Sequence, residues 1–258
     1  MPKLNIVIPM AGRGSRFAKV GYTMPKPLIE VLGVPMIKLV IDNIRPRCAH
    51  RFIFLCQAEH LALYALAEKL EQWVPGCAII SLNGITEGAA CTVLLARSLI
   101  ESDEPLMIAN SDQWVDIDIN EYLDFCGKGG LDGCIMTMKS NDPKWSFIRL
   151  NGQGMITEVV EKQVVSDEAT VGIYNFSCGR DFIAAAHAMI EQNLSVNGEF
   201  YVAPVYNQLL LNGANIGYYN IGSDFDGMYG LGTPEDIEML LSTPDNPLHL
   251  NYVNSNVY

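Results

Sequence analysis

The sequence has 258 residues, of which 49% are hydrophobic and 18% are charged, and this composition excludes a disordered chain. No apolar run approaches about 18 residues, which excludes a membrane-spanning helix. The 17 Lys and Arg residues against 29 Asp and Glu residues give a formal net charge of −12, which argues against nucleic acid or an anionic membrane surface as the main partner.

Strand-like and helix-like segments alternate along the first half of the chain. Short apolar runs predict strands at 4–8, 51–56, 77–82 and 105–109, and helical spacing predicts helices at 35–47, 60–73 and 89–100. This βα repeat predicts a parallel sheet wrapped by helices, which binds its ligands beyond the carboxyl ends of the strands. Two polar segments, 9–17 and 110–112, follow predicted strands at that edge.

The second half is less regular and adds strands joined by Gly and Asn turns. Strands are predicted at 132–138, 147–150, 155–160 and 170–176, and helices at 181–192 and 202–211. Thr233 is expected to cap a last helix that begins with Pro234. We therefore expect one mixed α/β domain at 1–242 and a loosely packed tail at 243–258.

Cysteine and histidine spacing argues against disulfides, zinc and catalytic triads. The seven cysteines are odd in number and lack CxxC spacing, so buried, reduced thiols are expected. Because no apolar signal segment opens the chain, a cytoplasmic protein is predicted. The four histidines lack metal-ligand spacing, and no serine lies in a nucleophile-elbow pattern.

Positive charge is concentrated at the start of an otherwise acidic chain. The first 29 residues hold five basic residues and no acidic one: Lys3, Arg13, Arg16, Lys19 and Lys26. This asymmetry indicates a local anion site, and a chance cluster on a solvated face is the alternative.

The segment after the first predicted strand has the character of a phosphate-binding turn. Gly12 and Gly14 let backbone N–H groups approach an anion, while Arg13 and Arg16 supply charge. A dinucleotide fingerprint would need a third glycine where Phe17 stands, and the spacing of a P-loop is also missing. The turn therefore favours a nucleoside triphosphate, with a plain βα turn as the alternative.

Lys26 lies between two prolines, Pro25 and Pro27. Each proline fixes its own φ angle and restrains the residue before it, so the lysine sits on a stiff backbone. A compact charge held in this way suits a phosphate, and a solvated Pro-rich turn is the alternative.

These motifs, in this order, resemble the sugar-phosphate nucleotidyltransferases, the makers of nucleoside-diphosphate sugars. The similarity covers about residues 3 to 241. It rests on Gly12-x-Gly14-x-Arg16, Pro25-Lys26-Pro27-Leu28, Gly33-x-Pro35-Met36-Ile37, Gly88-Ala89-Ala90, Asn110-Ser111-Asp112, Val160-Glu161-Lys162, Val171-Gly172-Ile173-Tyr174, Gly198-Glu199-Phe200-Tyr201 and Gly232-Thr233-Pro234-Glu235-Asp236.

The resemblance implies a fold and a reaction. The fold is a Rossmann-like three-layer α/β/α nucleotide-diphospho-sugar transferase fold with a mixed, mostly parallel central sheet, divided into a nucleotide half at 1–115 and an acceptor half at 116–242. In the reaction, a phosphate oxygen of the acceptor attacks the α-phosphorus of an NTP and pyrophosphate leaves. Such a step needs positioning and charge neutralisation more than a protein nucleophile.

The resemblance also implies roles for individual residues. The catalytic residues would be Arg16 on the leaving phosphates, Lys26 on the α-phosphate, and Asp112 as ligand of Mg²⁺. The nucleotide would contact Met10, Ala11, Gly12, Arg13, Gly14, Ser15, Asn83, Gly88 and Ala89. The acceptor would contact Glu161, Lys162, Gly172, Glu199 and Tyr201.

Some of these residues also have plain structural interpretations. Asp112 could cap the segment after its strand, and Glu161 with Lys162 could form an exposed charge pair. Asn197-Gly198 could form a turn that leaves Glu199 and Tyr201 structural.

The sequence departs from the family pattern at the second metal ligand. Many members carry an aspartate two residues before the closing Gly-Thr, where this chain has Gly230. Asp224 or Asp226 could substitute, or Asp112 could hold the metal with phosphates and water. Because Asn110-Ser111-Asp112 also differs from a plain Gly-Asp, the acceptor could be a sugar 1-phosphate or a non-sugar phosphate such as phosphocholine.

Two other classes compete with a nucleotidyltransferase. A glycosyltransferase of the related fold would use an Asp-x-Asp metal motif, and Asp116-Ile117-Asp118 has that spacing at a helix-like start. A non-catalytic homologue is the third interpretation. Within the leading hypothesis CTP is mildly preferred by analogy with short family members, the product would feed surface or capsular polysaccharide synthesis, and homo-oligomers are possible.

Overall fold

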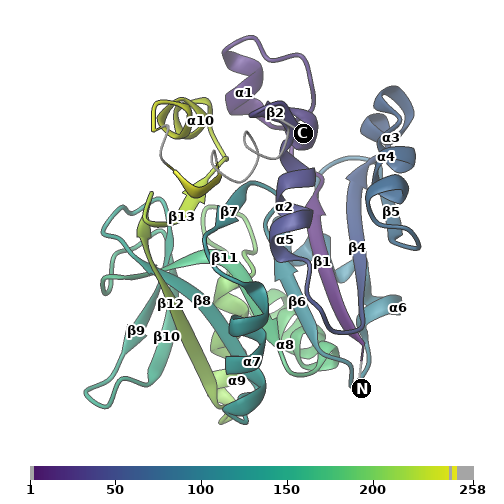
Figure 1. Cartoon of the computed structure of the whole chain (residues 1–258). Coiled ribbons are helices and arrows are strands. Elements are labelled where there is room, and N and C mark those ends of the chain that lie inside the picture. Colours follow the sequence, from purple (N-terminus) through teal and green to yellow (C-terminus); the bar gives the residue numbers. More distant parts are fainter. Residues whose placement is uncertain (1–2, 244–245, 249–258) are drawn as a thin grey trace.

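A computed structural model describes residues 3–243 and 246–248, and a mixed eleven-stranded sheet forms its centre (Figure 1). Its first part is parallel and has the order β5-β4-β1-β6. These strands are β1 (Leu4–Met10), β4 (His50–Gln57), β5 (Ala78–Leu82) and β6 (Leu106–Ala109). The four strands predicted for the first half are therefore confirmed, with ends that shift by one or two residues.

The second part of the sheet begins with an antiparallel strand, β11 (Glu168–Phe176), which pairs with β6 on one side and with β8 on the other. The order continues β8-β12-β13-β7, while β9 pairs with β11 and β10 pairs with β9. The bounds are β7 (Gln113–Val115), β8 (Gly133–Lys139), β9 (Ser146–Leu150), β10 (Ile156–Glu161), β12 (Ile216–Asp224) and β13 (Gly227–Gly230). The sheet is thus mixed and mostly parallel, as expected.

Helices cover both faces of the sheet, which gives the three layers. One core cluster contains buried residues of α2 (Met36–Ile44), α4 (Leu66–Trp73) and α7 (Ile119–Lys128), with partly buried residues of α3 (Ala58–Tyr64) packed against it. The opposite cluster contains residues of α5 (Ala89–Leu94), α6 (Arg97–Ile100), α8 (Gly179–Glu191), the 3₁₀ helix η2 (Ala203–Val205) and α9 (Tyr206–Leu211). Successive side chains of β1 point to opposite faces of the sheet, so Ile6 and Ile8 belong to the first cluster and Val7 to the second.

A third, smaller cluster lies at the top of the molecule in Figure 1. It contains residues of α1 (Ser15–Lys19), the β2–β3 pair (Glu30–Val31 and Val34–Pro35) and α10 (Pro234–Leu241). Thr233 caps α10 as predicted, because its hydroxyl accepts a hydrogen bond from the Asp236 amide. In the tail expected to pack loosely, Leu248 instead joins this cluster and Asn246 is buried; residues 244–245 and 249–258 lie outside the described part.

Several predicted helices are interrupted. The helix expected at 60–73 breaks at Ala65, whose φ of 51° is left-handed and ends α3, and Leu66 and Leu70 of α4 are then fully buried. The helix expected at 89–100 is divided into α5 and α6 by a tight turn at Leu95 and Ala96, whose amides donate three residues back. The helix expected at 202–211 opens as a 3₁₀ turn.

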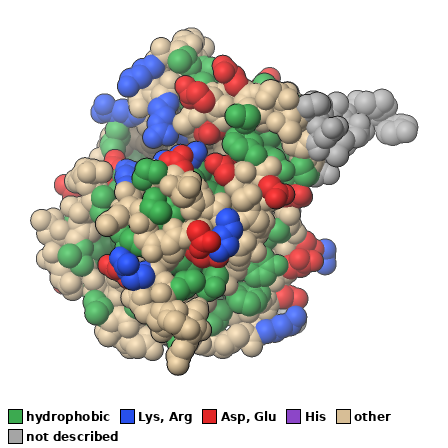
Figure 2. All heavy atoms as spheres, turned by 90° about the vertical axis from the view of Figure 1, so that its left-hand side faces the viewer, with side chains coloured by type: hydrophobic (Ala, Val, Ile, Leu, Met, Phe, Trp, Pro, Cys, Tyr) green, Lys and Arg blue, Asp and Glu red, His purple; other side chains and the backbone are tan. Residues whose placement is uncertain are grey.

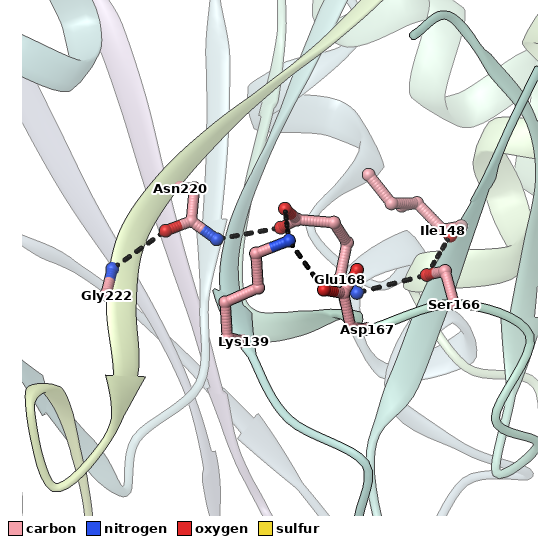
Figure 3. Close-up of polar contacts among 7 residues, drawn as sticks. All are labelled: Lys139, Ile148, Ser166, Asp167, Glu168, Asn220 and Gly222. Carbon is pink, nitrogen blue, oxygen red and sulfur yellow. Dashed lines mark hydrogen bonds and ion pairs between the residues drawn. The ribbon is translucent and has the colours of Figure 1, made fainter. Parts of the chain in front are cut away.

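A polar network joins three strands of the second half (Figure 3). Lys139 on β8 lies 2.8 Å from both Asp167 and Glu168, and the buried Glu168 also accepts a 2.8 Å hydrogen bond from Asn220 on β12. The Ser166 hydroxyl, in the loop before β11, donates a 2.6 Å hydrogen bond to the Ile148 carbonyl. The network fixes the register of β8, β11 and β12 by satisfying a buried carboxylate.

Two smaller expectations also concern the whole chain. All seven cysteines are unpaired, but only Cys56, Cys126 and Cys134 are buried as expected, and Cys48 is exposed. In the described part of the chain, each helix is too short or too polar to cross a bilayer.

Candidate active site

One edge of the sheet gathers the polar segments that follow the parallel strands. β1 leads into the glycine turn, β4 ends at Gln57, Asn83 follows β5, and 110–112 follows β6. Because β11 runs antiparallel, Ile173 pairs with Ala109 and the preceding Gly172 also lies at this edge. The two polar segments singled out in the sequence therefore meet in space.

The glycine turn packs directly on the lysine segment. Gly14 has a φ of 60° and precedes α1, and a Cβ placed on it would lie 3.1 Å from the Lys26 Cβ. Gly12 has open space around its Cα. Arg13 and Arg16 are exposed, and neither has a hydrogen-bond or ion-pair partner within residues 3–243 and 246–248. Two unpaired guanidinium groups beside an open glycine form a site suited to an anion.

Lys26 forms an ion pair with Asp112, which brings together two residues that are 86 positions apart. Lys26 opens the 3₁₀ turn η1 (Lys26–Leu28), which the Leu28 amide closes with a 2.8 Å hydrogen bond to the Pro25 carbonyl. The two side chains are 20% and 26% exposed, so the pair is screened from most of the solvent but remains open to a ligand.

A cavity of about 550 Å³ lies on the side of the turn nearest β4 and β5. It is lined by Gly12, Arg13, Gln57, Ala58, Glu59, His60, Leu82, Asn83, Gly84 and Ile85. Gln57 holds this side together, because its side-chain NH₂ donates to the carbonyls of Ala11 and Gly84. Sequence reasoning missed Gln57, although its position at a strand end was the same signal that marked Asp112.

A second cavity, of about 370 Å³, lies between the turn and the second half of the chain. Its lining includes seven residues predicted for the site: Arg16, Ala89, Glu161, Lys162, Gly172, Glu199 and Tyr201. It also includes Asn110, Lys144, Trp145, Ser146, Thr170, Tyr174, Val202 and Ala203. Residues 144–146 lie in a loop before β9 and at its start, and no sequence pattern marked them.

Charged and hydroxyl groups are coupled inside the second cavity. Ser146 donates a hydrogen bond to Glu161, which is only 8% exposed, and burial raises the pKa of this carboxyl group. Lys162 donates to the Tyr201 hydroxyl, which in turn donates to Glu199. Burial and the Glu199 carboxylate raise the Tyr201 pKa, so Tyr201 stays protonated at neutral pH. The cavity thus offers carboxylate acceptors next to cations.

Two glycines in this region are required by packing. Gly88 has a φ of 119°, and a Cβ on it would lie 2.5 Å from the backbone N and O of Phe200. Gly172 has a φ of 82°, and a Cβ there would overlap the Asn110 amide. Both positions therefore demand glycine whether or not a ligand touches them.

Other predicted residues are placed less directly. The Met10 side chain is buried in the core, so only its backbone faces the turn. The Ala11 carbonyl accepts a hydrogen bond from Gln57. Ser15 is the first residue of α1, and its side chain is exposed. The turn at 197–198 exists, with both residues at positive φ and Val196 bridged to Glu199.

The candidate metal ligands have different neighbours. The Asp224 carboxylate faces Lys144 at 3.6 Å and has Asp236 as a further charged neighbour. Burial and the nearby Asp226 raise the pKa of the Asp116 carboxyl group. Asp118 caps α7 by accepting from the Asn120 amide and pairs with Arg47 at 2.6 Å. Asp118 therefore serves a helix end, and neither Asp116 nor Asp118 lines the two cavities.

Asp112 remains a suitable oxygen donor for a hard cation. A Cβ placed on Gly232 would lie 2.9 Å from Asp112 Oδ2, so the absence of a side chain at Gly232 keeps the surface beside this carboxylate open. Within the described residues, no three His, Cys, Asp or Glu side chains are grouped to hold a metal by themselves. A divalent cation here would complete its shell with phosphate oxygens and water, as Mg²⁺ commonly does.

Figure 2 shows the side of the molecule on which Figure 1 places α10, β9 and β10. Lys and Arg side chains gather at its upper edge, where Figure 1 places α1 and α10, and Asp and Glu side chains lie close beside them. A larger cavity of about 820 Å³ lies elsewhere, between β10 and α9, and shares only Glu161 with the predicted site. Charges of both signs line the second of the smaller cavities, where Lys144 and Lys162 lie with Glu161 and Glu199.

Comparison with known proteins bears on this geometry. A family model described as nucleotidyl transferase matches residues 6–197. Mannose-1-phosphate guanylyltransferase catalytic subunit beta of Danio rerio is 29% identical over 67% of this chain and 50% of its own length. The mannose-1-phosphate guanyltransferase of Aspergillus oryzae is 25% identical over 66% of this chain and 49% of its own. The chain thus spans about half the length of the curated relatives it matches.

Solved structures share the whole architecture. The nucleoside-diphosphate-sugar pyrophosphorylase from Vibrio cholerae RC9 is 26% identical, has a TM-score of 0.75, and is matched over 92% of this chain and 99% of its own. The inositol-1-phosphate CTP transferase from T. maritima is 14% identical, with a TM-score of 0.70 over 95% of this chain and 98% of its own, and shows the fold alone.

Proposed function

The chain belongs to the nucleotidyl transferase family, and on this basis we propose that it transfers a nucleoside monophosphate from an NTP to a phosphorylated small molecule and releases pyrophosphate. One observation carries the proposal. Arg13 lines the first cavity, Arg16 lines the second, and Gly14 between them packs on Lys26, which pairs with Asp112. The cationic groups therefore lie where a nucleotide in one cavity would meet an acceptor in the other.

The proposed chemistry asks the protein to position reactants and neutralise charge. An acceptor phosphate oxygen attacks the α-phosphorus in line, and the bond to the β-phosphate bridging oxygen breaks. Lys26 neutralises the α-phosphate, while Arg13 and Arg16, which have no partners among the described residues, receive the triphosphate and the leaving pyrophosphate. When bound at Asp112, Mg²⁺ would add a further positive charge next to the phosphates.

The nucleotide base would be contacted at Gln57. Because its NH₂ group is used by two carbonyls, only its Oε1 is left for a ligand, and no donor in the described residues occupies it. A free acceptor suits a donor on the base edge, which the exocyclic amino groups of cytosine, adenine and guanine and the N3–H of uracil and thymine all supply. CTP is proposed as the preferred nucleotide by analogy with short members of the family.

The acceptor would occupy the second cavity. Lys144 and Lys162 provide cations for its phosphate, and the carboxylates of Glu161 and Glu199 accept hydrogen bonds from hydroxyl groups. Several hydroxyls on a small ring fit this arrangement, so a sugar 1-phosphate is the proposed acceptor. A phosphorylated non-sugar such as phosphocholine is the second candidate, because the nearby Trp145 and Tyr201 rings could contact a quaternary ammonium group.

A matrix of substrates tests the proposal. CTP, GTP, ATP, UTP and dTTP would each be combined with mannose 1-phosphate, glucose 1-phosphate, inositol 1-phosphate and phosphocholine in the presence of Mg²⁺, and released pyrophosphate would be measured. We expect release with at least one sugar phosphate, fastest with CTP. If no pair releases pyrophosphate while the chain consumes a nucleotide sugar, the function is that of a glycosyltransferase.

The cysteines bear on the cellular setting. The free cysteines fit a reducing compartment, so we propose that the protein works in the cytoplasm and supplies an activated precursor for surface or capsular polysaccharide. Deletion of the gene in its native host, followed by surface-glycan analysis, would test this role.

A further inference from the structure

We propose that Asp236 is the second carboxylate for a divalent cation held by Asp112, an inference that rests on the proposed function. Asp236 lies in the first turn of α10, and no motif or comparison assigns it a ligand. Three observations, on the strand next to Asp112, on the start of α10 and on two glycines, place its carboxylate beside that of Asp112.

The first observation is the path of β13. Its last residue, Gly230, pairs with Gln113 of β7, and the next amide, Leu231 N, donates a 2.8 Å hydrogen bond to the Asp112 carbonyl. The residues at 230–232 are therefore fixed against the segment that carries Asp112.

The second observation is the start of α10. Thr233 caps this helix and accepts from the Asp236 amide at 3.1 Å, which holds Asp236 in the first turn. A Cβ placed on Gly230 would have the Asp236 carboxyl group as its nearest neighbour, with Cγ at 3.5 Å. The Asp236 side chain thus covers the face of the strand that a side chain at position 230 would otherwise occupy.

The third observation joins the two carboxylates. A Cβ on Gly232 would lie 2.9 Å from Asp112 Oδ2 and 3.7 Å from Asp236 Oδ2, so the two oxygens are at most the sum of those distances apart. Among the described residues, the Asp236 side chain has no hydrogen-bond or ion-pair partner, whereas Asp112 is already paired with Lys26. Two carboxylates on one open glycine surface suit Mg²⁺, which prefers one or two carboxylates together with substrate phosphates.

The glycine at position 230 explains why the carboxylate comes from the helix. Gly230 has no positive φ, so its backbone would accept any side chain, and the space above it is filled by Asp236. A carboxylate at position 230 and one at position 236 would therefore reach the same place from opposite elements, and one can replace the other.

Mn²⁺ binding to the full chain tests this assignment without any nucleotide. Free Mn²⁺ would be measured by electron paramagnetic resonance during titration of the wild type, Asp236→Asn and the matched control Glu235→Gln, which removes an exposed carboxylate from the same helical turn. We expect Mn²⁺ affinity to fall at least about 10-fold in Asp236→Asn and to stay within about two-fold in the control.

A rescue variant separates ligation from a structural effect. Gly230→Asp combined with Asp236→Ala places a carboxylate on the strand and removes the side chain that fills the space above position 230, and we expect it to restore most of the lost Mn²⁺ affinity. Wild-type affinity in Asp236→Asn, an equal loss in both single variants, or no Mn²⁺ binding by the wild type would overturn the assignment. Failure of the substrate matrix with Mn²⁺ binding intact would instead overturn the proposed function.

Discussion

Replacing Gly88 with alanine should destabilise the fold and weaken acceptor binding together. Gly88 has φ 119° and ψ 174°, a region almost restricted to glycine, and a side chain there costs about 1–3 kcal/mol. The new Cβ would also lie 2.5 Å from the Phe200 backbone, which accepts a 3.0 Å bond from Ala90 and donates a 2.7 Å bond to Glu87. Displacing these bonds adds about 1 kcal/mol each or more, so we expect a total loss of about 3–6 kcal/mol.

Urea unfolding would measure this loss, with Gly84→Ala as the matched control. Gly84 also has a positive φ, 97°, but a Cβ there would meet nothing within 4 Å, so only the backbone strain remains, about 1–3 kcal/mol. The acceptor KM of Gly88→Ala should rise as well, because the Phe200 segment carries Tyr201 of the second cavity. Equal losses of stability in the two variants would refute the role assigned to the Phe200 contact.

Three further predictions concern single side chains. Lys26→Ala should lower kcat by at least about 100-fold while the protein still folds, because a cation aimed at developing phosphate charge is removed; near-native turnover would refute this role. Glu161→Gln should raise the free energy of unfolding at pH 7 but not at pH 4. Because burial raises the Glu161 pKa, the stability of the wild type falls as pH increases from about 4.5 through the folded-state pKa, and the glutamine variant lacks this loss. Parallel pH profiles of the two proteins in urea unfolding would contradict this. Lys139→Met should cost about 1–3 kcal/mol by leaving the buried Glu168 with one fewer partner, whereas Lys128→Met, which removes an exposed pair, should cost under about 0.5; similar losses in urea unfolding would refute the difference.

The sequence predicts best the strands whose own residues are apolar enough to require burial. Continuous apolar runs such as 4–8 and 105–109 read as buried parallel strands, and they form the centre of the sheet. β12 and β13 were missed because they mix tyrosine, glycine and polar residues and depend on their neighbours for pairing. The break at Ala65 has no Gly or Pro signal, and only tertiary packing around α4 explains it.

The sequence predicted those site residues that form a recognisable chemical pattern and directly follow a strand. The rule that ligands lie beyond the carboxyl ends of parallel strands brought the glycine turn and Asp112 to one edge, and the structure places Lys26 there as well. Lys144 and Trp145 could not be found in this way, because they reach the second cavity from a loop whose position depends on the β9–β10 hairpin. Their contribution is tertiary, and no local pattern encodes it.

The second metal carboxylate shows why distance along the chain is a poor guide at this edge. The sequence suggested Asp224 or Asp226, which lie just upstream of Gly230; Asp226 lies near Asp116, while Asp224 faces Lys144 at 3.6 Å and has Asp236 as a further charged neighbour. Asp236 is equally near in sequence and lies downstream, where the chain reverses into a capped helix whose first turn folds back over the strand end. The chain reverses after β13, and this reversal brings a second carboxylate, that of Asp236, to Asp112. A residue that replaces a missing strand carboxylate can therefore come from the helix that packs across the strand end.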